Sequence, residues 1–426
     1  MRQAGRPTLQ RVKQLMSPES EADLPGEAVL PGALPEGLRA ELVAFRRDLH
    51  MHPELGNQEF RTTAAIKERL ERAGLKPRVL PIGTGLVCDI GTNTDSGQWA
   101  GGPRMLALRA DIDALPIPDT KSECEYRSRV PDRAHACGHD VHTTVVLGTG
   151  LVLAELHEQG LLPRPVRLLF QPAEEVLPGG AADAIEGGAL DGVRRILAVH
   201  CDPRVDAGRI GLRVGPITSA CDRLEIALNG PGGHTARPHL TTDLVTAAAR
   251  VVTDVPPLVA RRVDSRSGLA LTWGRIESGH APNVIPQHAE LAGTVRCLDL
   301  DAWRQAPDLV VGAIDEIANL YRAKSEITYV RGVPPVVNEV TSTELLQAAM
   351  VARRGTDSVE STEQSLGGED FSWYLEHVPG AMARLGVRPP GERVIRDLHQ
   401  GDFDVDEHAI TVGAEMFTAA ALIDAV

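Results

Sequence analysis

His135-Ala136-Cys137-Gly138-His139-Asp140-Val141-His142 places three histidines, a thiol and a carboxylate within eight consecutive residues. Each of these side chains can donate a lone pair to a divalent cation once it is deprotonated. The apolar run over 145–156 follows and indicates a buried helix, whose start Asp140 could cap. The pattern therefore predicts a loop of metal-ligand side chains that leads directly into a helix of the core.

The same stretch has an alternative interpretation, which is a loop with a core cysteine and hydrogen-bonded histidines. A single cysteine or histidine would favour this alternative, because buried cysteines are common in protein cores. Here Cys137-x-His139 is followed by His142 about one helical turn later. We therefore expect a metal-binding loop.

The composition places the chain among ordinary globular proteins. Its 426 residues are enough for two or three domains, and 42% hydrophobic with 24% charged residues is a usual balance. The net charge of −14, without a basic tract, argues against a nucleic-acid partner. No apolar run reaches membrane-spanning length and the start lacks the apolar segment of a signal peptide, so we expect no membrane association.

The six cysteines stand far apart in the sequence, at positions 88, 124, 137, 201, 221 and 297. A chain of this length needs no disulfide bonds to fold, and no CxxC pair occurs. We therefore expect reduced thiols and a cytoplasmic protein.

Three short apolar runs, over 105–109, 166–170 and 196–199, are typical of buried strands. Helical segments over 145–157 and 181–186 separate them, and this alternation indicates a largely parallel α/β sheet. Ligands of such sheets bind beyond the carboxyl ends of the strands. The runs are followed by side chains that can bind a metal or move a proton, namely Asp111 and Asp113, Glu174 and Glu175, and His200.

Two parts of the chain fall outside this α/β pattern. Residues 1–35 are rich in proline and glycine without sustained periodicity, so we expect a flexible extension. Residues 216–332 follow the order βαββαβ, which indicates a ferredoxin-like α+β domain inserted into the α/β domain of 36–215 and 333–426. We expect its strands at 223–228, 269–276, 290–297 and 326–330 and its helices at 243–255 and 309–324.

Five ligand-type residues are plausible ligands of two cations in one site, namely Cys137, His139, Glu175, His200 and His399. Adjacent residues at a strand end point in different directions, so one carboxylate of the Glu174–Glu175 pair can bind metal while the other acts as a general base. A solvated loop is the alternative for this pair, as a surface histidine is for His399. Asp111 and Asp113 either orient the imidazoles or form turns.

Seven segments occur in order along the chain: Arg109–Pro116 (RADIDALP), His135–Asp140 (HACGHD), Gln171–Glu175 (QPAEE), Gly230–His239 (GPGGHTARPH), Pro282–Pro286 (PNVIP), Gly293–Arg296 (GTVR) and Gly367–Phe371 (GGEDF). With these segments the chain resembles, from about Leu38 to its C-terminus, the M20 family of metallopeptidases. It is most similar to the amidohydrolase branch, which includes hippurate hydrolases and auxin-conjugate hydrolases. The resemblance implies a zinc-peptidase-like, phosphorylase/hydrolase-like α/β catalytic domain with a largely parallel sheet, and an inserted ferredoxin-like dimerisation domain.

The resemblance also implies roles for single residues. It makes Cys137, His139, Glu175, His200 and His399 the metal ligands, and Glu174 the general base. His234 of the inserted domain would reach the active site of a neighbouring subunit in a homodimer; from the residues alone it reads as a turn histidine. Asn283 and Arg296 would hold the carboxylate of the substrate or the tetrahedral oxyanion.

Two positions depart from the family pattern. Val141 stands where the family has the second glycine of Cys-Gly-His-Asp-Gly-His, and this changes the local backbone but no ligand. Gln400-Gly401 follows His399 where the family often has Ser-Pro, so the substrate pocket has its own shape.

These observations predict a metal-dependent amidohydrolase. It would cleave the amide bond of an N-acyl or N-aroyl amino acid with two divalent ions, zinc or manganese: the thiol of Cys137 favours zinc, while imidazole and carboxylate suit either. A carboxypeptidase or dipeptidase on the same scaffold is the alternative. A catalytically inactive metal-binding homologue is a third hypothesis.

Overall fold

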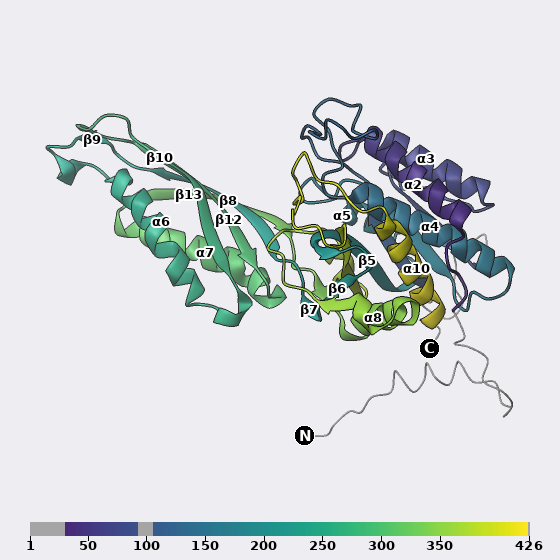
Figure 1. Ribbon diagram of the computed structural model, residues 1–426. Coiled ribbons are helices and arrows are strands. Elements are labelled where there is room, and N and C mark those ends of the chain that lie inside the picture. The colour runs from purple at the N-terminus through teal and green to yellow at the C-terminus, as the bar shows by residue number, and fades with distance from the viewer. Residues whose placement is uncertain (1–29, 93–104, 425–426) are drawn as a thin grey trace, which may run out of the picture.

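The computed structural model describes residues 30–92 and 105–424, which form two lobes (Figure 1). One lobe is built around an eight-stranded sheet, and the other is an elongated insert around a four-stranded sheet. No helix in these two ranges combines the length and the apolar character needed to cross a membrane.

The large sheet has a parallel centre. Strands β4, β3, β5 and β16 are parallel to one another, and β15 is parallel to β6, while the pairs β1–β2, β2–β4 and β6–β16 are antiparallel. All residues of β3 and β4 are buried, as expected for strands covered on both faces. The mostly parallel α/β fold is therefore confirmed. The strand order is β1 (Arg78–Val79), β2 (Leu86–Ile90), β4 (Val166–Gln171), β3 (Met105–Asp111), β5 (Val193–Asp206), β16 (Gly380–Arg388), β6 (Ile210–Leu212) and β15 (Val359–Ser361).

Helices cover the two faces of this sheet. The larger hydrophobic cluster packs helix α4, which is buried on nearly all sides, against its neighbours on one face. A second cluster lies on the other face under two short helices, α5 (Ala181–Glu186) and α9 (Ser372–Leu375). The helices of the first face are α2 (Glu36–Met51), α3 (Phe60–Arg72), α4 (His139–Glu158), α8 (Val340–Arg354) and α10 (His408–Ile423).

The predicted flexible extension over 1–35 lies outside the described residues up to residue 29. Residues 30–35 differ from the expectation, because they pack on the first helical layer. Leu34 is 2% exposed, and its backbone N–H donates to the Glu415 carboxylate. The carbonyl of Leu30 accepts a hydrogen bond from Arg353. Apolar burial of Leu34 offsets the lack of regular structure in this segment.

The insert has the predicted βαββαβ order. Its strands pair antiparallel in the order β10-β12-β8-β13, and helices α6 and α7 cover one face over a separate hydrophobic cluster. Strand β10 is an edge strand, and most of its residues are exposed. The predicted boundaries of 216–332 stay a prediction. The elements are β8 (Ala220–Asn229), α6 (Leu244–Ala260), β10 (Ala270–Ser278), β12 (His288–Cys297), α7 (Leu300–Leu320) and β13 (Lys324–Val333).

Two small ribbons complete the insert. The pair β7 (Gly215–Pro216) and β14 (Val337–Asn338) lies where the chain enters and leaves it. The pair β9 (Gly233–His234) and β11 (Val284–Ile285) forms part of the tip that lies far from the large sheet (Figure 1).

The root of the insert is held by a buried carboxylate. Asp222 of β8 accepts hydrogen bonds from Trp303 Nε1 at 3.0 Å, from the Tyr329 hydroxyl at 2.7 Å and from the backbone N–H of Gly332 at 2.8 Å. Trp303 also packs edge-on against Trp373 of the catalytic lobe, with ring centroids 6.1 Å apart. Polar contacts therefore hold the base of the insert together, and an aromatic contact packs it against the catalytic lobe.

Candidate active site

A cavity of about 360 Å³ lies at the carboxyl ends of the central strands. It is lined by Cys137, Glu174, Glu175, His200 and His399 of the catalytic lobe, and Arg296 of β12 faces it from the insert. Strand-end loops of a parallel sheet converge at this edge, so residues far apart in sequence meet there.

The five candidate ligands come together around this cavity. Cys137 Sγ lies 3.5 Å from His200 Nε2, His139 Nε2 lies 3.8 Å from Glu175 Oε1, and His399 Nε2 lies 3.5 Å from the same Glu175 oxygen. Two groups of ligand atoms fit within 4.8 Å, one of Cys137, His139 and His200 and one of Cys137, Glu175 and His399. The two groups share Cys137, and such an arrangement can hold two neighbouring cations.

The imidazole of His139 is oriented by Asp113. Its Nδ1 donates to the Asp113 carbonyl at 2.9 Å and lies 3.1 Å from Asp113 Oδ1, so Nε2 is left free. His139 Nε2 and Glu175 Oε1 are both buried and have no hydrogen-bond partner among the described residues. Buried polar atoms without partners are costly, and a cation between them would satisfy both.

His200 is oriented in the same way, by a backbone carbonyl. Its Nδ1 donates to the Cys201 carbonyl at 2.8 Å, which leaves Nε2 directed at Cys137. The sequence predicts a strand that ends just before His200, but β5 continues to Asp206 because β16 pairs with it over this length. His200 therefore lies within a strand rather than on a loop.

The helix after the Cys137 loop starts earlier than predicted. Helix α4 begins at His139 instead of residue 145, so His139 and His142 occupy its first turn. Asp140 is not the cap that the sequence predicts, because Gly138 precedes the helix and Asp140 pairs instead with Arg46 Nε at 2.7 Å. His50 Nδ1 contacts the same Asp140 oxygen at 2.7 Å.

The other two histidines of this stretch differ from the candidate ligands. Both ring nitrogens of His142 are used, since Nδ1 lies 2.6 Å from Asp111 Oδ1 and Nε2 accepts the Cys201 N–H at 2.8 Å. His135 is buried, burial lowers its pKa to about 3, and it belongs to no group of ligand atoms within 4.8 Å of one another among the described residues. Neither histidine is therefore a candidate ligand in this arrangement.

Glu174 and Glu175 have different surroundings. Glu175 donates its backbone N–H to Asp113 Oδ2 at 2.9 Å, and its carboxylate faces His139 and His399. Burial alone would raise the pKa of Glu175, but the contacts with these two histidines lower it. The pKa of Glu174 is raised, first by burial and then by the neighbouring carboxylates of Glu369 and Glu175.

Sequence reasoning missed a guanidinium that organises these carboxylates. The fully buried Arg109 contacts Asp111 at 2.7 Å, Asp370 at 2.8 Å and Glu369 at 3.1 Å, and its Nε donates to Gln171 at 2.9 Å. Arg109 and Asp370 stand 261 positions apart in sequence. The segments RADIDALP and GGEDF signal both residues, but spacing alone does not pair them.

Around the candidate active site, carboxylates outnumber the buried cationic side chains. Burial alone would lower the pKa of His139, but Asp111, Asp113 and Glu175 outweigh it and raise that pKa to about 10. The thiol of Cys137 has a pKa well above its ordinary value, because of burial and then because of Glu175 and Glu174. A site with this charge excess favours bound cations, which would also hold Cys137 as a thiolate.

His399 is brought to the site by a loop. Its φ is 61°, a left-handed conformation, and its backbone N–H donates to the carbonyl of Ala136 at 2.8 Å. This hydrogen bond ties the late loop to the Cys137 loop and explains how a histidine near the C-terminus reaches Glu175. Half of the His399 side chain stays exposed to the cavity and to solvent.

The predicted site residues of the insert are placed differently. Arg296 lines the cavity, and its guanidinium donates to the carbonyl of Leu366 in the catalytic lobe. His234 and Asn283 do not line the cavity and lie at the far tip, where His234 pairs with Val284. A single chain therefore brings Arg296 to the site but not His234 or Asn283.

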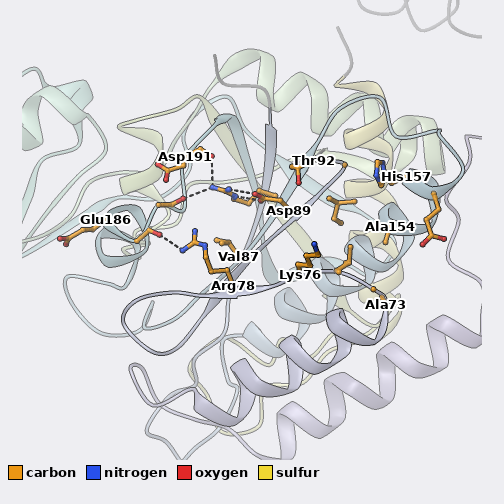
Figure 2. A pocket seen from close by; sticks show the side chains of 18 residues that line it. Ala73, Lys76, Arg78, Val87, Asp89, Thr92, Ala154, His157, Glu186 and Asp191 are labelled. Carbon is orange, nitrogen blue, oxygen red and sulfur yellow. Dashed lines mark hydrogen bonds and ion pairs between the residues drawn. The ribbon is translucent and has the colours of Figure 1, made fainter. Parts of the chain in front are cut away.

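A larger cavity, of about 790 Å³, lies at the opposite edge of the sheet (Figure 2). Its lining includes Arg167 at the start of β4, whose guanidinium contacts both Asp89 oxygens at 2.7 Å and three backbone carbonyls. Arg78 donates to the Gly187 carbonyl beside it. Carboxylate and carbonyl oxygens therefore satisfy these two guanidinium groups, and the cavity faces the amino ends of β3 and β4. The smaller cavity is therefore the candidate active site.

Comparison with known proteins identifies the family to which the chain is similar. The model of peptidase family M20/M25/M40 matches residues 107–423. The N-acetyl-L-cysteine deacetylase of Bacillus subtilis (strain 168) is 37% identical over 373 residues, which cover 88% of this chain and 85% of that protein. The crystal structure of B. subtilis YxeP, a dinuclear metal-binding peptidase of the M20 family, superposes with a TM-score of 0.77 at 34% identity and covers 92% of this chain and 99% of that one.

One relative is much longer than this chain. A protein of Rhodococcus jostii (strain RHA1), named putative glutamate–cysteine ligase 2-3, is 46% identical over 379 residues. The match covers 89% of this chain but only 46% of that protein, so this chain spans about half of its length.

Proposed function

This chain belongs to the M20/M25/M40 peptidase family, a family of hydrolases, and we propose that it is a metal-dependent amidohydrolase. It cleaves the amide bond of an N-acyl or N-aroyl amino acid to a carboxylic acid and a free amino acid. The observation that carries the proposal is the meeting of five ligand-type side chains beside Glu174 at the carboxyl ends of the central strands.

The donor set fits two divalent cations. Cys137, His139, Glu175, His200 and His399 would hold them, and the unpartnered His139 Nε2 and Glu175 Oε1 support this assignment. Asp113 orients His139, and Asp111 would act through Arg109 and His142. The thiol of Cys137 favours zinc, while the imidazole and carboxylate ligands suit manganese as well.

The chemistry supplied by bound cations is a lowered pKa of water and a polarised amide carbonyl. Glu174 lies at the edge of this ligand set, with its Oε2 4.0 Å from His139 Nε2. Its carboxylate takes a proton from the attacking water and returns it to the leaving amine. The raised pKa of Glu174 suits both steps, because the group can hold this proton between them.

Substrate binding requires residues of the insert. Arg296 faces the cavity and would hold the substrate carboxylate or the tetrahedral oxyanion. His234 and Asn283, at the far tip, would complete the site of a second chain. We therefore propose a homodimer formed through the insert, whose edge strand β10 and uncovered sheet face are exposed.

Two alternatives remain within the same site. A carboxypeptidase or dipeptidase would use the same ligands and Glu174, but with a peptide as substrate. A catalytically inactive homologue would keep the ligands without turnover. The complete set of candidate ligands together with Glu174 favours an enzyme over the inactive homologue.

A substrate panel tests the proposal. We expect metal-loaded protein to hydrolyse N-acetyl, N-benzoyl or indoleacetyl amino acids faster than dipeptides with a free amino terminus, measured by release of the amino acid with zinc and with manganese. Faster hydrolysis of the dipeptides would support the peptidase instead. No hydrolysis of any compound by protein shown to contain metal would support the inactive homologue.

The location is a separate proposal. All six cysteines are free thiols in the structure, as we expect for a protein of a reducing compartment. We propose a cytoplasmic protein on this ground.

A further inference from the structure

Arg384 is a buried arginine without a partner. It lies on β16, is 6% exposed, and forms no hydrogen bond or ion pair with any residue of 30–92 and 105–424. The other buried arginines, by contrast, are all paired: Arg46 with Asp140, Arg109 with three carboxylates and Arg167 with Asp89. Leaving a buried guanidinium unpaired is costly, so the exception requires an explanation.

The strand register places Arg384 beside the candidate metal centre. Arg384 is the residue of β16 that pairs with His200 of the parallel neighbour β5. Paired residues of adjacent strands project to the same face of a sheet, so the guanidinium side chain and the candidate ligand share one face. Arg384 lines the cavity of about 360 Å³ on this side, together with Cys137 and Glu174.

Arg384 also lines a second cavity, of about 260 Å³, which adjoins the first. Ser365 and Leu398 line both cavities as well, so these three residues form the boundary between them. A substrate group that extends past the metal centre in this direction must pass Arg384. Arg296 of the insert, by contrast, lines only the first cavity.

We propose that Arg384 binds a carboxylate of the substrate in the candidate active site. A guanidinium presents two parallel N–H donors that match the two oxygens of a carboxylate, and its charge persists on burial. This inference rests on the proposed function, because it needs an acylated amino acid in the cavity. The carboxylate is either the α-carboxylate of the amino acid or a second carboxylate on its side chain.

A role in charge balance alone is the competing explanation. Asp202, Glu369 and Cys137 are the groups whose charges act favourably on Arg384, although none pairs with it. If Arg384 only offset these charges, its loss would change metal binding and would slow all substrates by the same factor. If Arg384 instead binds a carboxylate, its loss would lower kcat/KM only for those substrates that carry this carboxylate.

The test compares matched substrates in Arg384→Met and in wild-type protein, both loaded with manganese. N-acetyl-L-alanine against N-acetyl-L-alaninamide reports on the α-carboxylate, and N-acetyl-L-glutamate against N-acetyl-L-glutamine reports on the second one. We expect one of these two preferences in kcat/KM to fall by about 10- to 100-fold in Arg384→Met, as for loss of a charged hydrogen-bonded pair. General damage to the fold would lower kcat/KM for both substrates of a pair alike, so it cancels in their ratio.

Arg388→Met is the matched control, because Arg388 lies on the same strand but pairs with Asp206 at 2.7 Å outside the cavity. It should leave both preferences as in wild type. Preferences that persist unchanged in Arg384→Met, or that are absent from the wild type, would overturn the inference. Bound manganese is measured in each variant, and a loss of metal with unchanged preferences would establish the charge-balance explanation instead.

Binding of the same four compounds by calorimetry separates this inference from the proposed function. The measurement uses the metal-loaded Glu174→Gln background, in which binding is observed without turnover. If the wild type hydrolyses none of the compounds, the proposed function fails, but the preference in binding still decides the role of Arg384. If hydrolysis occurs and Arg384→Met changes neither preference, the proposed function stands and this inference fails.

Discussion

Glu174 and Glu175 are adjacent and chemically identical, so only their surroundings can separate their roles. Glu175 faces His139 and His399, while Glu174 lies near Glu369 and Asp370. We expect Glu174→Gln to keep metal and substrate binding while kcat falls about 10²- to 10⁴-fold, because the change removes the general base and no ligand. Metal content and steady-state kinetics measure both effects.

Glu175→Gln is the paired variant. It removes an anionic ligand, so metal affinity itself should fall, together with activity. If Glu174→Gln instead loses metal and Glu175→Gln retains it, the two assignments are reversed.

Glu59 gives the stability of the fold a dependence on pH. Its carboxylate accepts the backbone N–H of Ala173 at 2.7 Å, and burial, with a smaller effect of Asp113, raises its pKa from 4.5 to about 7. The folded state therefore holds this proton more tightly than the unfolded state. Its contribution to stability is full below about pH 4.5 and is lost as the pH rises through about 7, by at most about 3 kcal/mol.

Glu59→Gln tests this effect, because an amide keeps an acceptor and does not ionise. We expect metal-free Glu59→Gln to lose less stability than metal-free wild type between about pH 5 and pH 8, measured as the free energy of unfolding in denaturant. Parallel pH profiles for the two proteins would show that Glu59 does not titrate in this range.

For single residues, the sequence predicted the candidate site residues better than the contacts that they make. Cys137, His139 and the glutamate pair stand out by spacing and by their place after apolar runs. The pairing of His142 with Asp111, and of Arg109 with Asp370, depends on which strands become neighbours. Such contacts span distant parts of the chain, so local pattern does not reveal them.

Among the elements, helix α4 depends on the glycine that precedes it. Gly138 has a φ of 86°, and a Cβ atom there would lie 2.6 Å from Cys201 Sγ. Gly160, just past the other end of α4, has a φ of 72°, and a Cβ atom there would have no neighbour within 4 Å among the described residues. Both positions disfavour side chains, but only Gly138 adds a clash with the core.

We expect Gly160→Ala to destabilise the protein by about 1 kcal/mol and Gly138→Ala by about 2–4 kcal/mol. Gly138→Ala should also weaken metal binding, because it displaces Cys137 and His139 on either side. Denaturant unfolding and metal titration measure the two effects. Equal losses of stability in both variants would show that the contact with Cys201 is unimportant.

The elements were predicted well in kind and less well in extent. Helix α4 begins six residues before the predicted 145, because its polar first turn is buried through contacts with Asp111, Asp113 and Arg46 rather than by apolar packing. Helix α7 begins at Leu300 instead of 309, with Asp299 as its cap, and Pro307 inside it obscured the helical pattern. In both helices tertiary contacts outweigh local pattern.

At the scale of the whole molecule, the predicted order βαββαβ was correct, because alternation and helical period are local properties. The distance between the insert tip and the catalytic centre was not predictable from the sequence. His234 lies at this tip, so a single chain leaves the predicted site without it.

Mixed dimers test whether His234 acts on the partner chain. We expect His234→Ala and Glu174→Gln each to be nearly inactive as homodimers. If His234 serves the neighbouring site, a mixed dimer contains one intact site, and an equal mixture after subunit exchange should recover about a quarter of wild-type activity. No recovery, although mass measurement shows that mixed dimers have formed, would show that His234 acts within its own chain, and a fully active His234→Ala homodimer would show that it has no role.

The central claim is that bound divalent cations make this site an amidohydrolase, and removal and return of metal test it most directly. Protein freed of metal by a chelator is titrated with Zn²⁺ or Mn²⁺ while hydrolysis of an N-acetyl amino acid is followed. We predict no activity without metal and recovery with about two equivalents per chain. Cys137→Ser should require more metal than Cys297→Ser, whose cysteine lies in the insert. Full activity in protein shown to be free of metal would contradict the account.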